Sequence, residues 1–546
     1  MGFYELTFPK MSPRFFIAFL TLVIGLLSSW FLFQTPESPK EAQTTKPVTK
    51  KVPEYIPSNP ASNRKKNTAG SNRNPDFDPN AIPYERVIAF SSEEAYRNFL
   101  KKLGDSRVRN KGTIDALRAV RIAFDSPADF ESLGLDPDDV QFNYTVSIPE
   151  LREVPPQPGA VGFGTTALEY LGINRDNSEW GRGVKIAVID TGIEPHLALG
   201  GNIKHINLVE LAEGSSPNSH GTSVASLIAG QHPNMRGVAP QAELISVRVA
   251  DESGISNSFL LAQGITAAAD AGAQLINISM GSSSDSNLVR QAVDYAIEQG
   301  AVIFASSGND GTAYSSYPAA DPDVYSVGAI DANGTHLNFS NTDDNLAFTA
   351  PGLEVQAAYP GDNVTSFTGT SGAVAFPVGA VAAIMSESNQ TISAQQAVQI
   401  LQDHSNEAGL PGADNQFGIG IVDVGRAIDR NTSGIVDVAV ASQNYLLPTS
   451  SSSASGLQVS IENRGTETVY QSTVDIQIGN DYFPYTLQKL SPNERTVVTI
   501  PSGLGQLRAE GQLEVSAKIN LSEGQIDVKP ANDQRKEIVT IPANDR

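Results

Sequence analysis

The segment VKIAVIDTGIEPH, residues 184–196, decides the fold prediction for this chain. Its apolar, β-branched run ends at Asp190 and is followed by Thr-Gly, which indicates a buried strand and then a tight turn. Further apolar runs between residues 242 and 330 alternate with helical stretches such as LVRQAVDYAIEQG, residues 288–300. This alternation predicts an α/β fold with a doubly wound, mainly parallel sheet that helices cover on both faces.

Asp190 is expected at the carboxyl end of its strand, the edge of a doubly wound sheet where functional sites are built. Two more motifs accompany it. NSHGTSVASLIAG, residues 218–230, places His220 at the start of a helix of small residues. SFTGTSGAVAFPVGAVAAIM, residues 366–385, places Ser371 in a glycine-flanked turn that opens an apolar helix. Each motif alone also fits an ordinary helix cap or a structural histidine.

Together, the order Asp, His and Ser in the contexts DTG, HGT and GTS resembles the arrangement in the subtilisin-like serine proteases, the subtilase family. The likeness extends over residues 165–430 and includes RGVAPQAELISVRV, LINISMGS, ASSGND and TAPG. It implies a serine endopeptidase that forms an acyl-enzyme intermediate. Ser371 would be the nucleophile, His220 the general base, and Asp190 the group that orients the imidazole. A lipase-like α/β-hydrolase is disfavoured, since its motif order differs and no Gly-x-Ser-x-Gly surrounds the serine.

The resemblance also implies roles around the substrate. Asn309 in ASSGND falls on the family's oxyanion asparagine, whose side-chain amide joins the Ser371 N–H in stabilising the tetrahedral intermediate. Ser279, Met280 and Gly281 in NISMGS fall on the segment that pairs with extended substrate and lines the first specificity pocket. A core position for Met280 stays open as the alternative.

Three features depart from the family pattern. Ala375 stands where a proline is usual and the proline follows at Pro377, while Ser226 replaces a common glycine. The loop GQHPNMR, residues 230–236, is shorter than the calcium-binding loop of secreted subtilisins. The resemblance implies no cofactor for the chemistry. A structural calcium ion is left without an assigned site, with the acidic run Asp321–Asp323 as one candidate position.

Residues 81–152 are predicted to form a small α+β domain, because strand-like and helix-like segments alternate there in the order β-α-β-α-β. Their place before the predicted catalytic domain, residues 160–431, resembles the propeptides of subtilisins, which act as folding chaperones and inhibitors. We therefore expect a zymogen that cleaves itself in the exposed linker, near residues 155–160. A permanent accessory domain is the alternative.

Residues 435–546 are predicted to form an all-β sandwich, because short strand-like runs are separated by turn residues at roughly ten-residue spacing. Two phrases in this region, SIENRGTETV and KPANDQRKEIVTI, resemble the adhesion-related domains of bacterial surface proteins. This leaves a second hypothesis, a surface binding or adhesion protein on a slow or inactive protease scaffold. The intact set of catalytic residues argues against it, since a silent site gains nothing from retaining them.

The N-terminal residues 1–33 are predicted to contain a transmembrane signal anchor. Phe15–Phe33 carries no charge, and at about 1.5 Å per residue it nearly crosses a ~30 Å hydrocarbon layer. A cleaved signal peptide and a buried core helix are the alternatives. Residues 34–80 read as a disordered linker. We expect a catalytic domain in the cell envelope, outside the cytoplasm, or secreted if the signal is removed.

The net charge of −22 disfavours nucleic acid as a partner, since a polyanion would be repelled. The chain has no cysteine, which excludes a thiol nucleophile, disulfides and thiolate zinc sites. The expected partners are protein or peptide substrates, with the membrane as a further partner through the N-terminal helix. The oligomeric state stays open.

Overall fold

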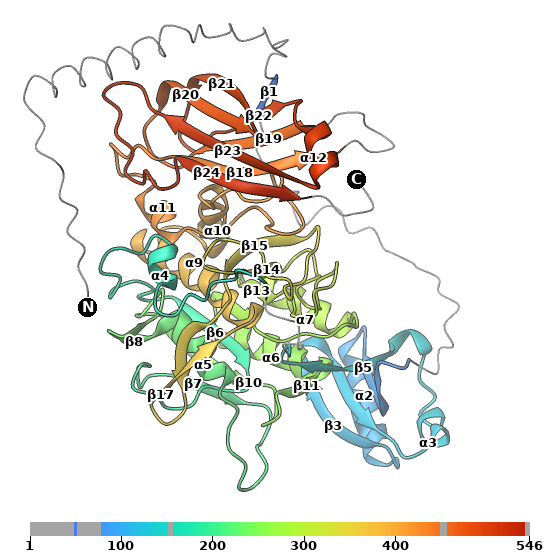
Figure 1. The fold of residues 1–546 in the computed structure, drawn as a ribbon. Helices are drawn as coiled ribbons and strands as arrows, with labels where there is room; N and C mark the ends of the chain where they lie inside the picture. Colours follow the sequence, from blue (N-terminus) through green and yellow to red (C-terminus); the bar gives the residue numbers. More distant parts are fainter. Residues whose placement is uncertain (1–47, 52–77, 151–156, 448–455, 541–546) are drawn as a thin grey trace, which may run out of the picture. The chain divides into compact units, whose positions relative to one another are not determined.

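The computed structural model describes residues 48–51, 78–150, 157–447 and 456–540 (Figure 1). The predicted membrane segment, Phe15–Phe33, lies outside these ranges, as does most of the predicted linker. Within the described ranges one helical stretch, Thr370–Glu387, has the length and hydropathy of a membrane span, and 89% of it is buried inside the protein. Its apolar surface is therefore covered by the protein itself.

A seven-stranded parallel sheet forms the centre of the fold, in the order β15-β14-β13-β12-β6-β10-β7. The strands are β6 (Lys185–Asp190), β7 (Lys204–Asn207), β10 (Glu243–Arg248), β12 (Leu275–Ile278), β13 (Val302–Ser306), β14 (Tyr325–Ile330) and β15 (Leu346–Pro351). The predicted doubly wound parallel sheet is confirmed. Strand β7 was not predicted, because it lies at the sheet edge and its sequence KHIN has no apolar run.

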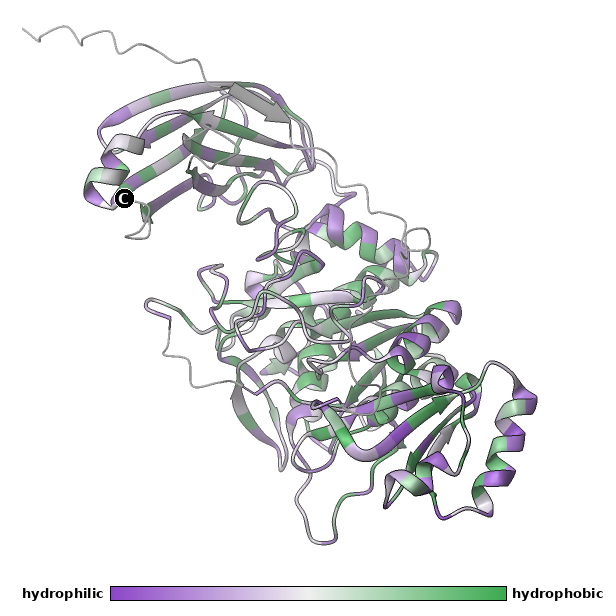
Figure 2. Ribbon diagram, turned by 90° about the vertical axis from the view of Figure 1, so that its right-hand side faces the viewer, coloured by the Kyte–Doolittle hydropathy of each residue, from purple (hydrophilic) through white to green (hydrophobic). Residues whose placement is uncertain are grey.

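Four helices cover this sheet: α5 (His220–Ala229), α6 (Ser258–Asp270), α7 (Asn287–Glu298) and α9 (Ala375–Glu387). Alternate side chains of β6 enter different cores. Ile186 and Val188 belong to the core that contains α5 and α9, whereas Ala187 and Ile189 belong to the core that contains α6 and α7. Figure 2 shows the strands of this interior mainly in the hydrophobic green. Burial of both faces explains why these strands are continuous apolar runs.

An α+β module precedes the central sheet and is drawn in blue in Figure 1. It contains β2 (Ala81–Ala89), α2 (Glu93–Gly104), β3 (Arg109–Ile114), β4 (Ala119–Ala123), α3 (Pro127–Glu131) and β5 (Val140–Ser147). Helix α2 starts after Ser92, whose side chain accepts a hydrogen bond from Ala95 N, and buries Tyr96, Phe99 and Leu103. The prediction missed β3, because its sequence RNKGTI is mostly polar and exposed.

The sheet of this module continues into the central part of the chain. Its order is β11-β5-β2-β4-β3, and β11 (Ile255–Asn257) lies immediately before α6. Strand β11 pairs antiparallel with β5, with Ile255 opposite Ser147 and Asn257 opposite Thr145. The module and the central sheet are therefore joined by main-chain hydrogen bonds.

Two four-stranded antiparallel sheets follow the central part. The first is β1-β22-β19-β18 and the second is β21-β20-β23-β24. Their bounds are β1 (Val48–Lys51), β18 (Val438–Leu446), β19 (Gly456–Asn463), β20 (Val469–Ile478), β21 (Asp481–Leu490), β22 (Arg495–Ile500), β23 (Gln512–Asn520) and β24 (Gln534–Thr540). Val459 and Ile461 of one sheet share a core with Val474 and Ile476 of the other. Each sheet thus buries one face, as alternating strands require.

The remaining elements are short and connect or flank these sheets. They are η2 (Asp115–Leu117), η3 (Pro137–Asp139), α4 (Ala167–Tyr170), β8 (Gln231–His232), β9 (Met235–Arg236), β16 (Val355–Tyr359), β17 (Asn363–Phe367), α8 (Thr370–Ala373), α10 (Ala394–Asp403), α11 (Val424–Asp429) and α12 (Leu504–Glu510). Of these, α8 and the hairpin β16–β17 contribute to the site described next.

Candidate active site

Asp190 and His220 meet at the carboxyl end of β6. His220 Nδ1 lies 2.9 Å from both carboxylate oxygens of Asp190, whose side chain is fully buried. Thr191 donates its backbone N–H (2.7 Å) and its hydroxyl (3.1 Å) to Asp190 Oδ1, which fixes the carboxylate. Because a carboxylate only accepts, Nδ1 of the neutral ring carries the hydrogen and Nε2 keeps its lone pair. The imidazole is therefore set up as a base.

A close backbone approach brings His220 to Asp190. Gly221 follows the histidine at the start of α5, and a β-carbon there would lie 2.4 Å from the carbonyl oxygen of Gly192. Any side chain would push the helix away from the turn after β6. The glycine of the HGT motif is thus needed for the geometry of the pair.

Ser371 lies in α8, which starts after Gly369 (φ +136°). Helix α8 contacts α5, and the ring of Phe367 lies beside both helices. The centroid of this ring is 5.3 Å from that of the His220 ring, and a β-carbon on Gly372 would lie 2.9 Å from Phe367 Cδ1. The Ser371 hydroxyl donates to the carbonyl oxygen of Ser279 at 3.2 Å. In the part of the chain that is described, no hydrogen bond joins this hydroxyl to His220.

Asn309 follows β13 and reaches the same place. Its Oδ1 accepts hydrogen bonds from the backbone N–H (3.0 Å) and the hydroxyl (2.9 Å) of Thr370, the residue before Ser371. These bonds fix which end of the amide is the donor. Nδ2 donates to the carbonyl oxygen of Pro149 at 2.9 Å. The amide is therefore held beside the serine and already bonds a main-chain carbonyl.

The predicted substrate-binding segment is paired with the chain's own residues. Ser147 N donates to Gly281 O at 3.0 Å and Gly281 N donates to Ser147 O at 2.9 Å. On the opposite side, Ile148 N donates to Gly254 O at 3.1 Å. The end of the module thus runs as an extended strand between two segments. Ser279–Gly281 were expected to pair with extended substrate, and residues 145–149 of the chain itself were not expected at this position.

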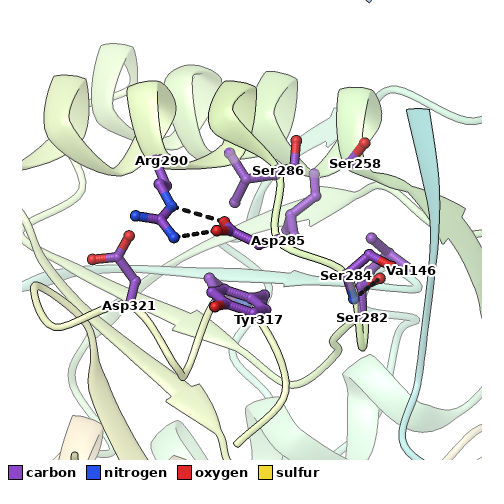
Figure 3. A pocket seen from close by; sticks show the side chains of 12 residues that line it. Val146, Ser258, Ser282, Ser284, Asp285, Ser286, Arg290, Tyr317 and Asp321 are labelled. Carbon is purple, nitrogen blue, oxygen red and sulfur yellow. Dashed lines mark hydrogen bonds and ion pairs between the residues drawn. The ribbon is translucent and has the colours of Figure 1, made fainter. Parts of the chain in front are cut away.

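Val146 of this strand is one of the residues that line a small pocket, which Figure 3 shows from close by. The pocket is lined by Ser258, Leu261, Ser282, Ser284, Asp285, Ser286, Val289, Arg290, Tyr317, Pro318 and Asp321. Val146 is 1% exposed, and the space that remains is about 10 Å³, room for one water molecule. Met280 is fully buried in the same core cluster as Val146, as expected if its side chain is a core residue.

One wall of this pocket is ionic. Arg290 forms a two-bond ion pair with Asp285, and Figure 3 shows Asp321 on the other side of the guanidinium. The hydrogen bond to Asp285 raises the pKa of Arg290, and burial raises the pKa of the Tyr317 hydroxyl. Among the described residues, no three His, Asp or Glu side chains lie close enough to share a metal ion. No calcium site is assigned at Asp321–Asp323.

The departures from the family pattern have structural explanations. Pro377 lies four residues after Ala373, the last residue of α8, and cannot donate the hydrogen bond that would continue α8 into α9, which fits the break at Val374. Ser226 replaces a common glycine and uses its hydroxyl: it donates to Ser223 O at 2.7 Å and accepts from Ala358 N at 2.9 Å. This bond ties α5 to β16.

Comparison with known proteins agrees with this geometry. Residues 181–420 match the model of the Subtilase family. The chain is 37% identical over 301 residues to an alkaline protease of Alkalihalobacillus alcalophilus, which covers 54% of this chain and 76% of that protein. It is 39% identical over 246 residues to subtilisin Savinase of Lederbergia lenta, with 44% and 89% covered. The chain belongs to the subtilase family. This subtilase is accordingly a serine endopeptidase, and its substrates are proteins or peptides.

More distant similarities were also found for this subtilase. The minor extracellular protease Epr of Bacillus subtilis is 32% identical over 247 residues, which is 44% of this chain and 38% of that protein. The crystal structure of the epidermin leader peptide processing serine protease of Staphylococcus aureus aligns with a TM-score of 0.54 at 20% identity. It covers 64% of this chain and 99% of the other. At that identity the likeness supports the fold alone.

Proposed function

We propose that this subtilase cleaves peptide bonds through the triad Asp190, His220 and Ser371. His220 Nε2 takes the proton of the serine hydroxyl as the hydroxyl attacks, and later gives it to the leaving amine. Asp190 holds the tautomer and stabilises the imidazolium. The amide of Asn309 and the N–H of Ser371 bond the developing oxyanion. The observation that carries this proposal is the hydrogen bond of 2.9 Å between Asp190 and His220, the first residue of α5, together with the contact between α5 and α8, the helix of Ser371.

Replacement of the nucleophile tests this proposal. Ser371→Ala is expected to keep the fold and lower the turnover of a peptide substrate by about 10⁶-fold, because the acyl-enzyme cannot form. Circular dichroism checks the fold, and a fluorophosphonate probe should label the unchanged enzyme at Ser371 only. Peptide hydrolysis at the original rate in Ser371→Ala would refute the assignment. Absence of labelling in the unchanged enzyme would favour a binding protein on an inactive scaffold.

We infer further that the module, residues 81–152, is a propeptide that blocks the site until the chain cleaves itself. Its strand β5 lies along Gly281, and its last described residues reach Asn309, where substrate is expected to bind. The alternative, a permanent accessory domain, predicts no cleavage. Mass spectrometry of the unchanged protein and of Ser371→Ala distinguishes the two, since self-cleavage leaves the Ser371→Ala chain whole.

The proposed location is outside the cytoplasm, in the cell envelope or secreted. Its support is the uncharged segment Phe15–Phe33 and the similarity to a protease described as extracellular. Fractionation of cells that express the full chain tests this. Recovery of activity in the membrane fraction supports an anchor, and recovery in the medium supports a removed signal. No metal or cofactor has a role in the proposed chemistry.

A further inference from the structure

The carbonyl group of Pro149 lies where the carbonyl group of a scissile peptide bond is expected. Its oxygen accepts the hydrogen bond from Asn309 Nδ2 at 2.9 Å. In the proposed mechanism, that amide bonds the carbonyl oxygen at the point of attack. The peptide bond that follows this carbonyl joins Pro149 to Glu150. Cleavage was expected from the sequence near residues 155–160. The described part of that segment, residues 157–160, is bound elsewhere, since Gly159 O accepts from Asn333 Nδ2.

The register of the strand shows which hydrogen bond is missing because residue 149 is a proline. Ser147 and Gly281 exchange both main-chain hydrogen bonds, so they form a hydrogen-bonded antiparallel pair. In an antiparallel ladder the next such pair lies two residues along each strand, which places residue 149 opposite Ser279. An N–H at residue 149 would therefore donate to Ser279 O. Pro149 has no N–H, and this carbonyl lacks its expected strand partner.

The hydroxyl of Ser371, the proposed nucleophile, donates to the same carbonyl oxygen, that of Ser279. Ser371 Oγ donates to Ser279 O at 3.2 Å, and Ser279 Oγ donates to Ser371 O at 3.2 Å. A serine attacks only when its hydroxyl donates to the base. The bond to Ser279 O directs the proton of the hydroxyl away from His220, and no N–H of residue 149 shares this acceptor with the serine.

We propose that Pro149 is a brake on the chain's own first cleavage, which falls at the Pro149–Glu150 bond. This rests on the proposed proteolytic function. In the cleavage, Ser371 Oγ bonds the Pro149 carbonyl carbon, its proton passes through His220 to the nitrogen of Glu150, and the C–N bond breaks. Water then hydrolyses the ester and leaves the Pro149 carboxylate. Until the serine leaves Ser279 O, the module stays bound as an inhibitor.

Proline removes one strand hydrogen bond and leaves the other contacts that attach the module in place. A residue that precedes proline is restricted to extended conformations, which is the conformation Ile148 needs in this strand. The bond from Ile148 N to Gly254 O at 3.1 Å and the burial of Val146 do not use the nitrogen of residue 149. A proline at this position therefore suits an inhibitor more than a substrate.

Substitution of the proline tests the brake. Pro149→Ala, Pro149→Gly and Pro149→Leu all restore an N–H that can donate to Ser279 O. Pulse-chase labelling of the full chain follows the precursor, and N-terminal sequencing of the product finds the cut. We expect all three variants to cleave between residues 149 and 150 about tenfold faster than the unchanged chain, the effect of one hydrogen bond. Pro137→Ala, an exposed proline of the same module, is the matched control and should leave the rate unchanged.

The outcomes separate the brake from the function on which it rests. Equal rates in the unchanged chain and the three variants would overturn the brake, as would acceleration by Pro149→Leu alone, which would indicate side-chain fit. A product that begins at any residue other than Glu150 would overturn the bond assignment. Loss of fluorophosphonate labelling and of peptide hydrolysis in every form, including the accelerated variants, would instead refute the proposed function.

Discussion

Among single residues, Asn309 offers the most direct test of the proposed mechanism, because the orientation of its amide is fixed. Thr370 fixes it through two hydrogen bonds to Oδ1, which leaves Nδ2 as the donor. Removal of this donor in Asn309→Ala should lower kcat by about 10²–10³-fold with little change in KM, because the lost bond forms fully only in the transition state. Steady-state kinetics of the mature enzyme measure this. A change in KM alone would show that the amide binds substrate without stabilising the oxyanion.

The second residue prediction concerns Gly221. A methyl group there would lie 2.4 Å from the Gly192 carbonyl oxygen, so Gly221→Ala should move the start of α5 and with it His220. A displacement of about 1 Å at a catalytic group costs roughly 10²-fold in rate. Fluorophosphonate labelling and kcat should fall together in a protein that still folds. Gly201→Ala is the control, because no atom lies within 4 Å of a β-carbon there, and it should keep full activity.

At the scale of elements, the connection between β14 and β15 carries a partly buried histidine. His336 packs edge-on against Phe417 at 5.9 Å, and burial lowers the pKa of its ring from 6.5 to about 4. Between pH 6.5 and pH 4 the unfolded chain binds a proton that the folded chain does not. The free energy of unfolding therefore falls as the pH is lowered through this window.

Removal of the His336 titration should flatten this dependence. In a Ser371→Ala background, which prevents self-digestion, His336→Gln should show a smaller drop in Tm between pH 7 and pH 5 than its parent. Differential scanning calorimetry at both pH values measures the drop. His232→Gln, at an exposed position in β8, serves as the control and should match the parent. An equal drop in His336→Gln and the parent would show that other groups set the acid sensitivity.

At the scale of the whole molecule, a buried ionic cluster joins the catalytic part to the strands that follow it. Glu462 of β19 is fully buried and pairs with Arg426 of α11 (2.9 Å), Arg464 (2.8 Å) and Arg495 (3.1 Å). Burial alone would raise the pKa of the Glu462 carboxyl, but the three guanidinium groups hold it below its ordinary range. The carboxylate thus pairs with one buried and two partly buried cations, of which Arg495 also pairs with Glu407.

Loss of that one charge should therefore destabilise both parts together. Glu462→Gln removes the only carboxylate that pairs with Arg426 and Arg464 among the described residues, while Arg495 keeps Glu407 at 2.9 Å. Loss of one partner of a buried ion pair typically costs about 3–5 kcal/mol. A single, lowered transition in calorimetry is expected, again in the Ser371→Ala background. Glu514→Ala removes an exposed ion pair with Lys536 and should cost at most about 1 kcal/mol. Two separate transitions in Glu462→Gln would show that the parts unfold independently.

The parallel sheet could be predicted from the sequence, because strands that are buried on both faces must be apolar throughout, and β6, β10, β12, β13 and β14 all show this. The candidate catalytic residues were predicted from the combination of three motifs and its resemblance to the subtilase family, because each motif alone also fits a structural role. The polar strand β3 and the edge strand β7 were missed, since their side chains face solvent and leave no apolar pattern.

The segment that occupies the candidate active site could not be predicted from the sequence. The segment Thr145–Pro149 reads in the sequence as an ordinary strand, and nothing local to it indicates Gly281, Gly254 or Asn309 as partners. Those partners lie more than a hundred residues away along the chain. The bonds with Gly281 and Gly254 join main-chain groups that every residue carries, and Asn309 donates to a main-chain carbonyl. Main-chain pairing leaves almost no trace in residue types, so its register, and the consequence of a proline within it, become visible only in the folded chain.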